Sequence, residues 1–209
     1  MSIESIVAEQ QPDIFVFSAE SEAEIKRHLA KYPEERKQSA VMPLLDIAQR
    51  QHDNWIPMKA IEEIADRLDM PKMRVLEVAS FYTMYNLKPV GKWFFQVCGT
   101  TPCMLRGSDD VIRCIKDKLD ISSGETSACG QFSMLEVECL GACVNAPIIQ
   151  LNDDFYEDLD YQSTAALIDQ LQAGEQPPHG SVINRQGSEA STGTTTLKTV
   201  KKDSKSAGK

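Results

Sequence analysis

Two pairs of closely spaced cysteines constrain this 209-residue sequence more than any other feature. Cys98 and Cys103 lie in "CGTTPC", with four residues between them, and Cys139 and Cys143 lie in "CLGAC", with three. The first pair follows "WFFQVC", which is typical of a buried strand, and the second follows "FSMLEVECL", which alternates as a strand does. If the two strands are neighbours, both pairs leave the same end and the four thiolates converge on one point.

Four converging thiolates suit either a zinc ion or an iron–sulfur cluster. The sequence has no secretory signal, so its six cysteines should stay reduced and available to a metal. Zinc sites favour a tighter turn between ligands. In a [2Fe–2S] cluster each pair needs only to chelate its own iron, so the wider spacings here favour the cluster. Gly99, Gly107 and Gly141 leave room for backbone N–H groups to approach the sulfides. Zinc and unliganded thiols stay open as alternatives.

Hydrophobic periodicity and composition divide the chain into four regions. Residues 21–90 are predicted to form a helical bundle after an N-terminal extension at 1–20, and 91–174 to form an α/β domain, so the expected fold class is α+β. Residues 175–209 are rich in Ser, Thr, Gly and Lys, which predicts a disordered tail. The tail has six basic and three acidic groups, hence +3, against -12 for the rest. We expect it to be dispensable for the cysteine site, with lysines that can meet an acidic partner.

Capping residues and prolines place the elements within these regions. Ser21 with Glu24 has the spacing of a capping box at the first helix, and the other three helices follow Ser39, Pro57 and Pro71. The fourth helix is expected to bury Val75, Val78, Ala79 and Tyr82. The α/β region is predicted to contain a strand at 93–98, a helix at 107–119 capped by Ser108, strands at 132–140, 147–152 and 154–159, and a helix at 163–172 capped by Ser163.

The stretches "VCGTTPCMLRG" and "VECLGACVNAP" resemble the thioredoxin-like [2Fe–2S] ferredoxin family. Upstream, "SAVMPLLDIAQRQ" and "FYTMYNLKPVGK" are similar to its members in flavin-linked NADH dehydrogenases. The resemblance covers residues of about 20–175 and implies a thioredoxin-like domain behind the helical bundle. It also implies one [2Fe–2S] cluster, with one cysteine pair on each iron. The ligands would be Cys98, Cys103, Cys139 and Cys143.

The resemblance implies one-electron transfer within an NADH-oxidising enzyme complex, with no catalytic residue and no substrate site on this chain. FMN and NADH would bind only to a partner subunit on which this chain docks, next to a further iron–sulfur subunit. The sequence itself has no G-x-G-x-x-G after a strand and no Walker loop, which agrees with this expectation. Two alternatives remain open: the equivalent small subunit of an NAD-linked hydrogenase or formate dehydrogenase, and a zinc-stabilised interaction module.

The remaining cysteines and the histidines are expected to lie outside the site. Cys114 falls within a predicted helix and reads as a half-buried structural residue. Cys129 precedes the second strand, at the opposite end from Cys139, and is therefore excluded as a ligand. The histidines, which give no Rieske-type pattern, are His28, His52 and His179.

Charge around the cysteines should influence the reduction potential. Glu136 and Glu138 would oppose the negative charge that reduction adds, and Arg106, three residues after Cys103, is expected to be the main counterweight. The formal net charge of -9 argues against binding to nucleic acid. No window is long and apolar enough to span a membrane. The acidic N-terminus predicts a bacterial cytoplasmic protein at the inner face of a membrane complex, or a mature organellar chain on the mitochondrial matrix side.

Overall fold

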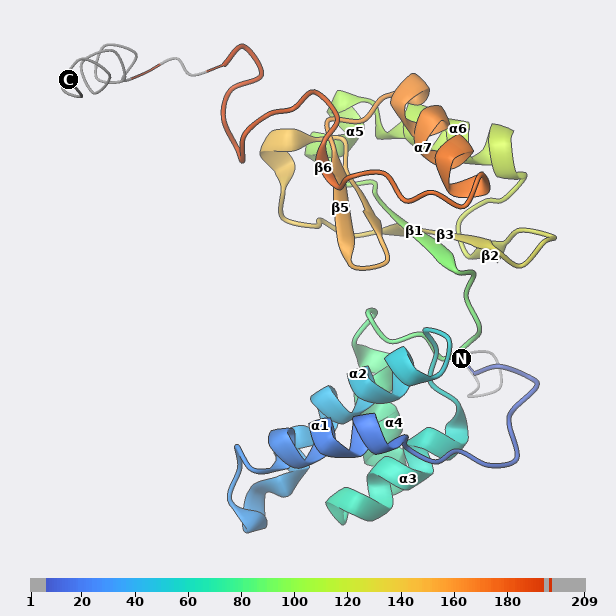
Figure 1. The fold of residues 1–209 in the computed structure, drawn as a ribbon, viewed down its shortest axis with the longest axis vertical. Coiled ribbons are helices and arrows are strands. Elements are labelled where there is room, and N and C mark those ends of the chain that lie inside the picture. Colours follow the sequence, from blue (N-terminus) through green and yellow to red (C-terminus); the bar gives the residue numbers. More distant parts are fainter. Residues whose placement is uncertain (1–6, 194–195, 197–209) are drawn as a thin grey trace. The chain divides into compact units, whose positions relative to one another are not determined.

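Residues 7–193 and Thr196 are described by the structure, which is a computed structural model. The chain forms two units, Met1–Lys92 and Trp93–Lys209, each with its own hydrophobic core. Figure 1 labels the helices of the first unit and the sheet and helices of the second. The first unit contains α1 (Ala19–Leu29), the 3₁₀ segment η2 (Glu34–Ala40), α2 (Val41–Gln51), α3 (Met58–Leu68) and α4 (Lys72–Phe81).

The first unit is a bundle of short helices that bury their apolar faces against one another. Pro57 and Pro71 precede α3 and α4 in extended conformation, as the sequence predicts, because proline lacks the N–H that a helix start leaves without a partner. Helix α2 contacts α1, α3 and α4. Phe15 and Phe17, from the segment before α1, also pack into this core. None of the helices in the described residues is long and apolar enough to cross a membrane.

Two details of the bundle differ from the sequence predictions. The first helix is capped by Ser18, whose Oγ accepts a hydrogen bond from the Ser21 N–H at 3.1 Å, so the capping residue lies one turn earlier than Ser21. Helix α4 buries Leu76, whereas Tyr82 is 40% exposed, because the helix ends at Phe81 and its periodicity stops there. Val78 is only partly buried.

The second unit is built on a mixed sheet of six strands in the order β2-β3-β1-β4-β5-β6. Its central strand β1 pairs in parallel with β3 and antiparallel with β4, with Cys98 opposite Val137. Helices α6 and α7 contact each other and cover one face of the sheet (Figure 1). The α+β prediction is confirmed. The elements are β1 (Trp93–Cys98), α5 (Thr101–Arg106), α6 (Ser108–Leu119), β2 (Glu125–Thr126), β3 (Phe132–Val137), η3 (Cys143–Asn145), β4 (Ile149–Leu151), β5 (Asp154–Glu157), α7 (Tyr161–Gln172) and β6 (Gly180–Ser181).

The core of this unit explains the strand pattern seen in the sequence. Trp93, Phe95 and Val97 alternate along β1, and all three pack with buried residues of α6 and α7. Phe95 is completely buried, and its ring stacks on Phe132 of β3 with centroids 6.2 Å apart. The parallel pairing of β1 with β3 therefore places the carboxyl ends of both strands at one edge, where the cysteine loops begin.

Local differences from the predictions concern short elements and helix starts. The segment after Cys98, expected to be a loop, contains the six-residue helix α5. Helix α6 begins after Gly107, which has a φ of 102°, and Ser108 makes no capping hydrogen bond. The strand predicted at 132–140 ends at Val137, and the two-residue strand β2 was not predicted.

The start of α7 makes a prediction about acid stability. Asp160 Oδ1 accepts a hydrogen bond from the Ser163 N–H at 2.7 Å, and Ser163 Oγ accepts one from the Asp160 N–H at 2.8 Å, so the cap is Asp160 and not Ser163 alone. The Ser163 N–H lowers the pKa of Asp160 below 3.8. The stabilisation that the ionised Asp160 cap gives to the fold is therefore complete above about pH 3.8, the ordinary pKa of an aspartate. It is lost as the pH falls through the lower pKa that Asp160 has in the folded state.

We expect Asp160→Ala to reduce the free energy of unfolding of the second unit by about 1 kcal/mol at neutral pH. Asp160→Asn keeps the cap but cannot ionise, so its stability should fall less than that of the parent between neutral pH and about pH 3. Urea titrations at several pH values measure both effects. An identical pH dependence in the parent and in Asp160→Asn would contradict this account of the cap.

The segment after α7 differs from the predicted disordered tail at 175–209. Residues 180 and 181 form strand β6, which pairs in parallel with β5, and Arg185 makes an ion pair with Asp158. This order depends on specific polar contacts, which composition and hydrophobic periodicity do not reveal. Residues 194–195 and 197–209, which include all the lysines of the predicted tail, lie outside the described residues.

Candidate metal centre

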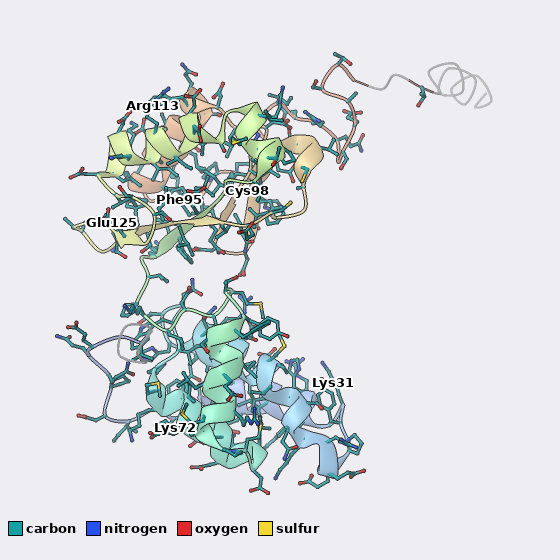
Figure 2. All side chains as sticks on the ribbon, turned by 180° about the vertical axis from the view of Figure 1, so that it is seen from behind. Lys31, Lys72, Phe95, Cys98, Arg113 and Glu125 are labelled. Atoms are coloured by element: carbon teal, nitrogen blue, oxygen red, sulfur yellow. The ribbon has the colours of Figure 1, made fainter. Side chains whose placement is uncertain are left out.

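The two cysteine pairs stand at the edge where β1 and β3 end. Cys98 is the last residue of β1, and Cys103 lies on α5, which follows directly. Cys139 comes two residues after the end of β3, and Cys143 begins η3. Figure 2 labels Cys98 at the end of β1 and Phe95 in the interior of the unit. The strands are parallel neighbours, as the sequence predicts, and this pairing brings together loops that lie about forty residues apart in the sequence.

The inner pair, Cys98 and Cys103, lies in a small apolar cluster with Ala146 and Ile148. Burial raises the pKa of Cys103 to about 12, and its hydrogen bond with Cys98 adds to the rise. Burial also raises the pKa of Cys98, but hydrogen bonds from the hydroxyl and N–H of Thr100 outweigh this effect and lower it overall. The pair therefore offers one thiol that ionises more readily and one that keeps its proton until a metal displaces it.

The outer pair, Cys139 and Cys143, lies nearer the surface, and its two Sγ atoms are 3.3 Å apart. The Gly141 N–H donates to Cys139 Sγ at 3.4 Å and lowers the pKa of Cys139, which the Cys143 thiol lowers further. The hydrogen bond between the two sulfurs raises the pKa of Cys143, because a second thiolate directly beside the first is unfavourable. Gly141 has a φ of 86°, a left-handed conformation that glycine adopts without strain.

Thr100 and Gly99 contribute to the site in ways that the sequence analysis missed. The Thr100 hydroxyl lies 3.2 Å from Cys98 Sγ, and it also helps to lower the pKa of Cys139, after the larger effects of the Gly141 N–H and the Cys143 thiol. A Cβ on Gly99 would come within 2.0 Å of Glu136 Oε1, so the glycine allows this carboxylate to cross the backbone beside Cys98. The contact of Thr100 with sulfur could have been predicted from its place two residues after Cys98, because a hydroxyl at that position can reach back to the sulfur.

This donor set fits a binuclear iron–sulfur cluster. Four thiols are grouped as two pairs, and the Thr100 hydroxyl lies 3.2 Å from one sulfur of the inner pair, Cys98 Sγ. The Gly141 N–H donates a hydrogen bond to Cys139 Sγ, and the Thr100 hydroxyl lies within hydrogen-bond distance of Cys98 Sγ, as is common around such clusters. Across residues 7–193 and Thr196, no group of three or more His, Cys, Asp or Glu side chains is arranged to hold a metal ion, so the fit rests on the two cysteine pairs taken separately.

The other candidate residues are found away from the two pairs or point elsewhere. Cys114 is fully buried in the core of α6, deeper than the predicted half-burial. Cys129 is exposed and precedes β3, at the end of the strand where Phe132 is opposite Trp93. The cysteine pairs follow the other end of the strand, a strand length of roughly 17–20 Å away. Arg106, predicted to be the main counterweight, is the exposed last residue of α5.

The histidines have other surroundings. His28 and His52 belong to the first unit, where the His52 ring packs against Trp55 with centroids 4.6 Å apart. His179 lies 3.5 Å from a carboxylate oxygen of Asp154. In the described residues, the side chains within hydrogen-bond distance of the sulfurs of the two pairs are therefore not imidazoles but those of Thr100 and the paired cysteines.

Comparison with known proteins decides which family this arrangement represents. The sequence model of the thioredoxin-like [2Fe-2S] ferredoxin family matches residues 25–172. This chain belongs to the thioredoxin-like [2Fe-2S] ferredoxin family. The match begins at Ile25, within α1, and includes α2, α3 and α4 of the first unit as well as both cysteine pairs of the second. Membership in this ferredoxin family gives the chain one [2Fe–2S] cluster as its cofactor.

Two curated relatives place this ferredoxin-family chain among the components of NADH-oxidising enzymes. It is 58% identical over 143 residues to an NADH-quinone oxidoreductase subunit of Rickettsia bellii, covering 68% of this chain and 86% of the relative. It is 48% identical over 183 residues to the mitochondrial NADH dehydrogenase [ubiquinone] flavoprotein 2 of Dictyostelium discoideum, covering 88% of this chain and 74% of the relative. Both relatives are named as parts of NADH-oxidising enzymes.

A solved structure shares the fold of the ferredoxin-family chain. The air-oxidized NAD+-reducing [NiFe]-hydrogenase aligns with a TM-score of 0.57 at 20% sequence identity. The alignment covers 65% of this chain but only 23% of the hydrogenase chain. At this identity the similarity shows the fold alone.

Proposed function

We propose that this chain is the [2Fe–2S] electron-carrying subunit in the NADH-oxidising module of respiratory complex I, the counterpart of its 24 kDa subunit. One observation carries the proposal: two cysteine pairs follow the carboxyl ends of neighbouring parallel strands in a chain 58% identical to a component of an NADH-quinone oxidoreductase. The assignment of Cys98, Cys103, Cys139 and Cys143 as the ligands is part of this proposal.

The residues of the site have distinct roles in it. When bound, the [2Fe–2S] cluster supplies a carrier for one electron at a time. Cys98 and Cys103 would hold the buried side, where the apolar cluster with Ile148 excludes water. The Gly141 N–H donates a hydrogen bond to Cys139 Sγ and would favour added negative charge there, and the Thr100 hydroxyl, 3.2 Å from Cys98 Sγ, would do the same as a donor to a metal-bound thiolate. The Glu136 carboxylate beside Gly99 would oppose that charge and would lower the reduction potential of the bound cluster.

The partners follow from the same assignment. A chain that carries only a one-electron group needs a neighbour that accepts hydride from NADH, and the proposed neighbour is the subunit that binds FMN and NADH. A further iron–sulfur subunit would receive or relay electrons. The net charge of -9 gives no support to nucleic acid as a partner. The proposed location is the cytoplasmic face of a bacterial inner membrane, or the matrix side in a mitochondrion.

The alternative assemblies can be separated by copurification. The similarity to an NAD+-reducing hydrogenase rests on 20% identity, whereas the Rickettsia bellii oxidoreductase component is 58% identical over 143 residues. A tagged chain expressed in its own host should therefore bring down an FMN-containing NADH dehydrogenase. Recovery with a hydrogenase or a formate dehydrogenase instead would place the same chemistry in another assembly.

We expect the purified chain to be brown-red and to contain two irons and two acid-labile sulfides per chain, since its two thiol pairs each suit one iron. Elemental analysis, sulfide assay and visible absorption measure this directly. A protein with one zinc per chain and no visible absorption would overturn the proposal in favour of a zinc-stabilised interaction module.

A further inference from the structure

The chain after α7 returns across the second unit and contacts β5 and the loop that contains Cys143. We call residues 176–189 the C-terminal strap. Tyr156 Oη donates to the Pro177 carbonyl at 2.8 Å, β6 pairs with β5, and the Val182 N–H donates to the Glu157 carbonyl at 3.1 Å. These contacts fix the path of the strap along β5, where β6 forms the edge of the sheet, and lead the strap toward the cysteine site.

Arg185 anchors the strap through a buried ion pair with Asp158. The two side chains are only 6% and 3% exposed, and Arg185 Nη2 donates to Asp158 Oδ1 at 2.6 Å. The other carboxylate oxygen, Oδ2, accepts from Ser181 Oγ at 2.6 Å, so both oxygens of Asp158 are bound by the strap. Removing either partner would leave the other charge buried without compensation, which is strongly unfavourable. The two side chains are therefore kept together, and the strap is held at Asp158.

The same groups hold the backbone that follows Cys143. Arg185 Nη1 donates to the Val144 carbonyl at 3.1 Å, and the Asp158 N–H donates to the Asn145 carbonyl at 2.7 Å. The Asn145 side chain in turn donates to the Gly187 carbonyl of the strap at 2.9 Å. Val144 and Asn145 are the two residues directly after Cys143, so each is bonded to the strap or to its anchor.

The inner and outer cysteine pairs differ in what fixes them. Cys98 ends a central strand and Cys103 lies on a helix, and both are completely or almost completely buried. Cys139 and Cys143 lie after β3 in a segment whose only regular element is the three-residue η3. The position of Cys143 therefore depends more on contacts from outside its own loop. The strap supplies such contacts to Val144 and Asn145, the two residues that follow Cys143.

We propose that Arg185 is a positioning residue that holds the Cys143 side of the cluster site, with the C-terminal strap as an integral part of that site. Its planar guanidinium bridges Asp158 to the Val144 carbonyl, a geometry that a single ammonium group cannot reproduce. The identity of the metal group rests on the proposed function, whereas the positioning of the loop is a property of the polypeptide alone.

The test uses full-length variants in the apo and cluster-bound forms. In Arg185→Gln, amides of residues 143–146 should exchange with deuterium roughly tenfold or more faster in the apo-protein, because hydrogen bonds to a charged group are lost. The cluster-bound variant should release iron to a chelator faster by a similar factor. Arg185→Lys should lie between Arg185→Gln and the parent. Arg113→Gln, on the exposed face of α6, is the matched control and should behave as the parent does.

A second variant separates loss of position from loss of folding. Arg185→Gln combined with Asp158→Asn removes both buried charges, so the unfolding temperature should recover toward that of the parent while residues 143–146 still exchange rapidly. Truncation after Gly193 retains the strap and should leave exchange unchanged, whereas truncation after Gly174 should reproduce the Arg185→Gln result. Parent-like exchange at 143–146 in the double variant would overturn the proposal. If the parent holds no iron, the proposed function fails, and the exchange measurement still decides the role of Arg185.

Discussion

Cys139→Ser is expected to remove most of the cluster, and Cys98→Ser, Cys103→Ser and Cys143→Ser should do the same or leave a labile remnant. Serine oxygen is a poorer ligand than thiolate for these irons, and in the proposed assignment each of the four thiols is needed as a ligand. Iron and sulfide content, with the visible spectrum, measure the loss. We expect at least about a tenfold fall in bound cluster after gel filtration, equivalent to about 1.4 kcal/mol.

The other two cysteines provide the controls. Cys129→Ser changes an exposed residue at the far end of β3, and Cys114→Ala replaces a buried thiol in α6 without adding an unpaired hydroxyl. Both should keep the full complement of iron and sulfide. Loss of the cluster in Cys129→Ser together with its retention in Cys139→Ser would show that the ligands are wrongly assigned.

Phe95→Ala should destabilise the second unit by about 3–5 kcal/mol, because it deletes a large side chain at the centre of the sheet. Phe95 is completely buried and stacks on Phe132, with Met134 and Leu151 opposite it on the two neighbouring strands. Chemical denaturation of the full chain measures the effect as a lower midpoint for the second unit.

Leu105→Ala is the control for Phe95→Ala, since Leu105 is 76% exposed on α5 and close to the cysteine loop. It should change stability by less than about 0.5 kcal/mol. Equal destabilisation by the two substitutions would mean that Leu105 is covered or that the sheet centre can repack around the missing ring.

The sequence predicted the main features of the site because the relevant signals were local. Alternation and burial along "WFFQVC" and "FSMLEV" identified β1 and β3, and each strand was followed at once by a cysteine loop. Pro57 and Pro71 marked helix starts for a steric reason that does not depend on the rest of the fold. The α+β class and the family were predictable from these signals.

The features that the sequence did not reveal depend on few residues or on distant partners. Helix α5 has six residues, too few for an apolar period to appear. The choice of Ser18 over Ser21 as a cap depends on where the preceding chain enters the core through Phe15 and Phe17. Composition predicts a solvated tail in place of the strap because nothing near Arg185 in the sequence indicates Asp158, which is 27 residues away.

The parallel pairing of β1 with β3 has a consequence for the order of events during synthesis. The ribosome delivers the central strand β1 first, but its partner β3 begins only at Phe132, and the strap that holds the last cysteine loop ends near residue 189. A parallel pair cannot form as a simple hairpin and requires the intervening crossover to be complete. The first two cysteines therefore emerge well before Cys139, Cys143 and the strap, so we expect that the proposed site cannot be complete until the ribosome has passed residue 189.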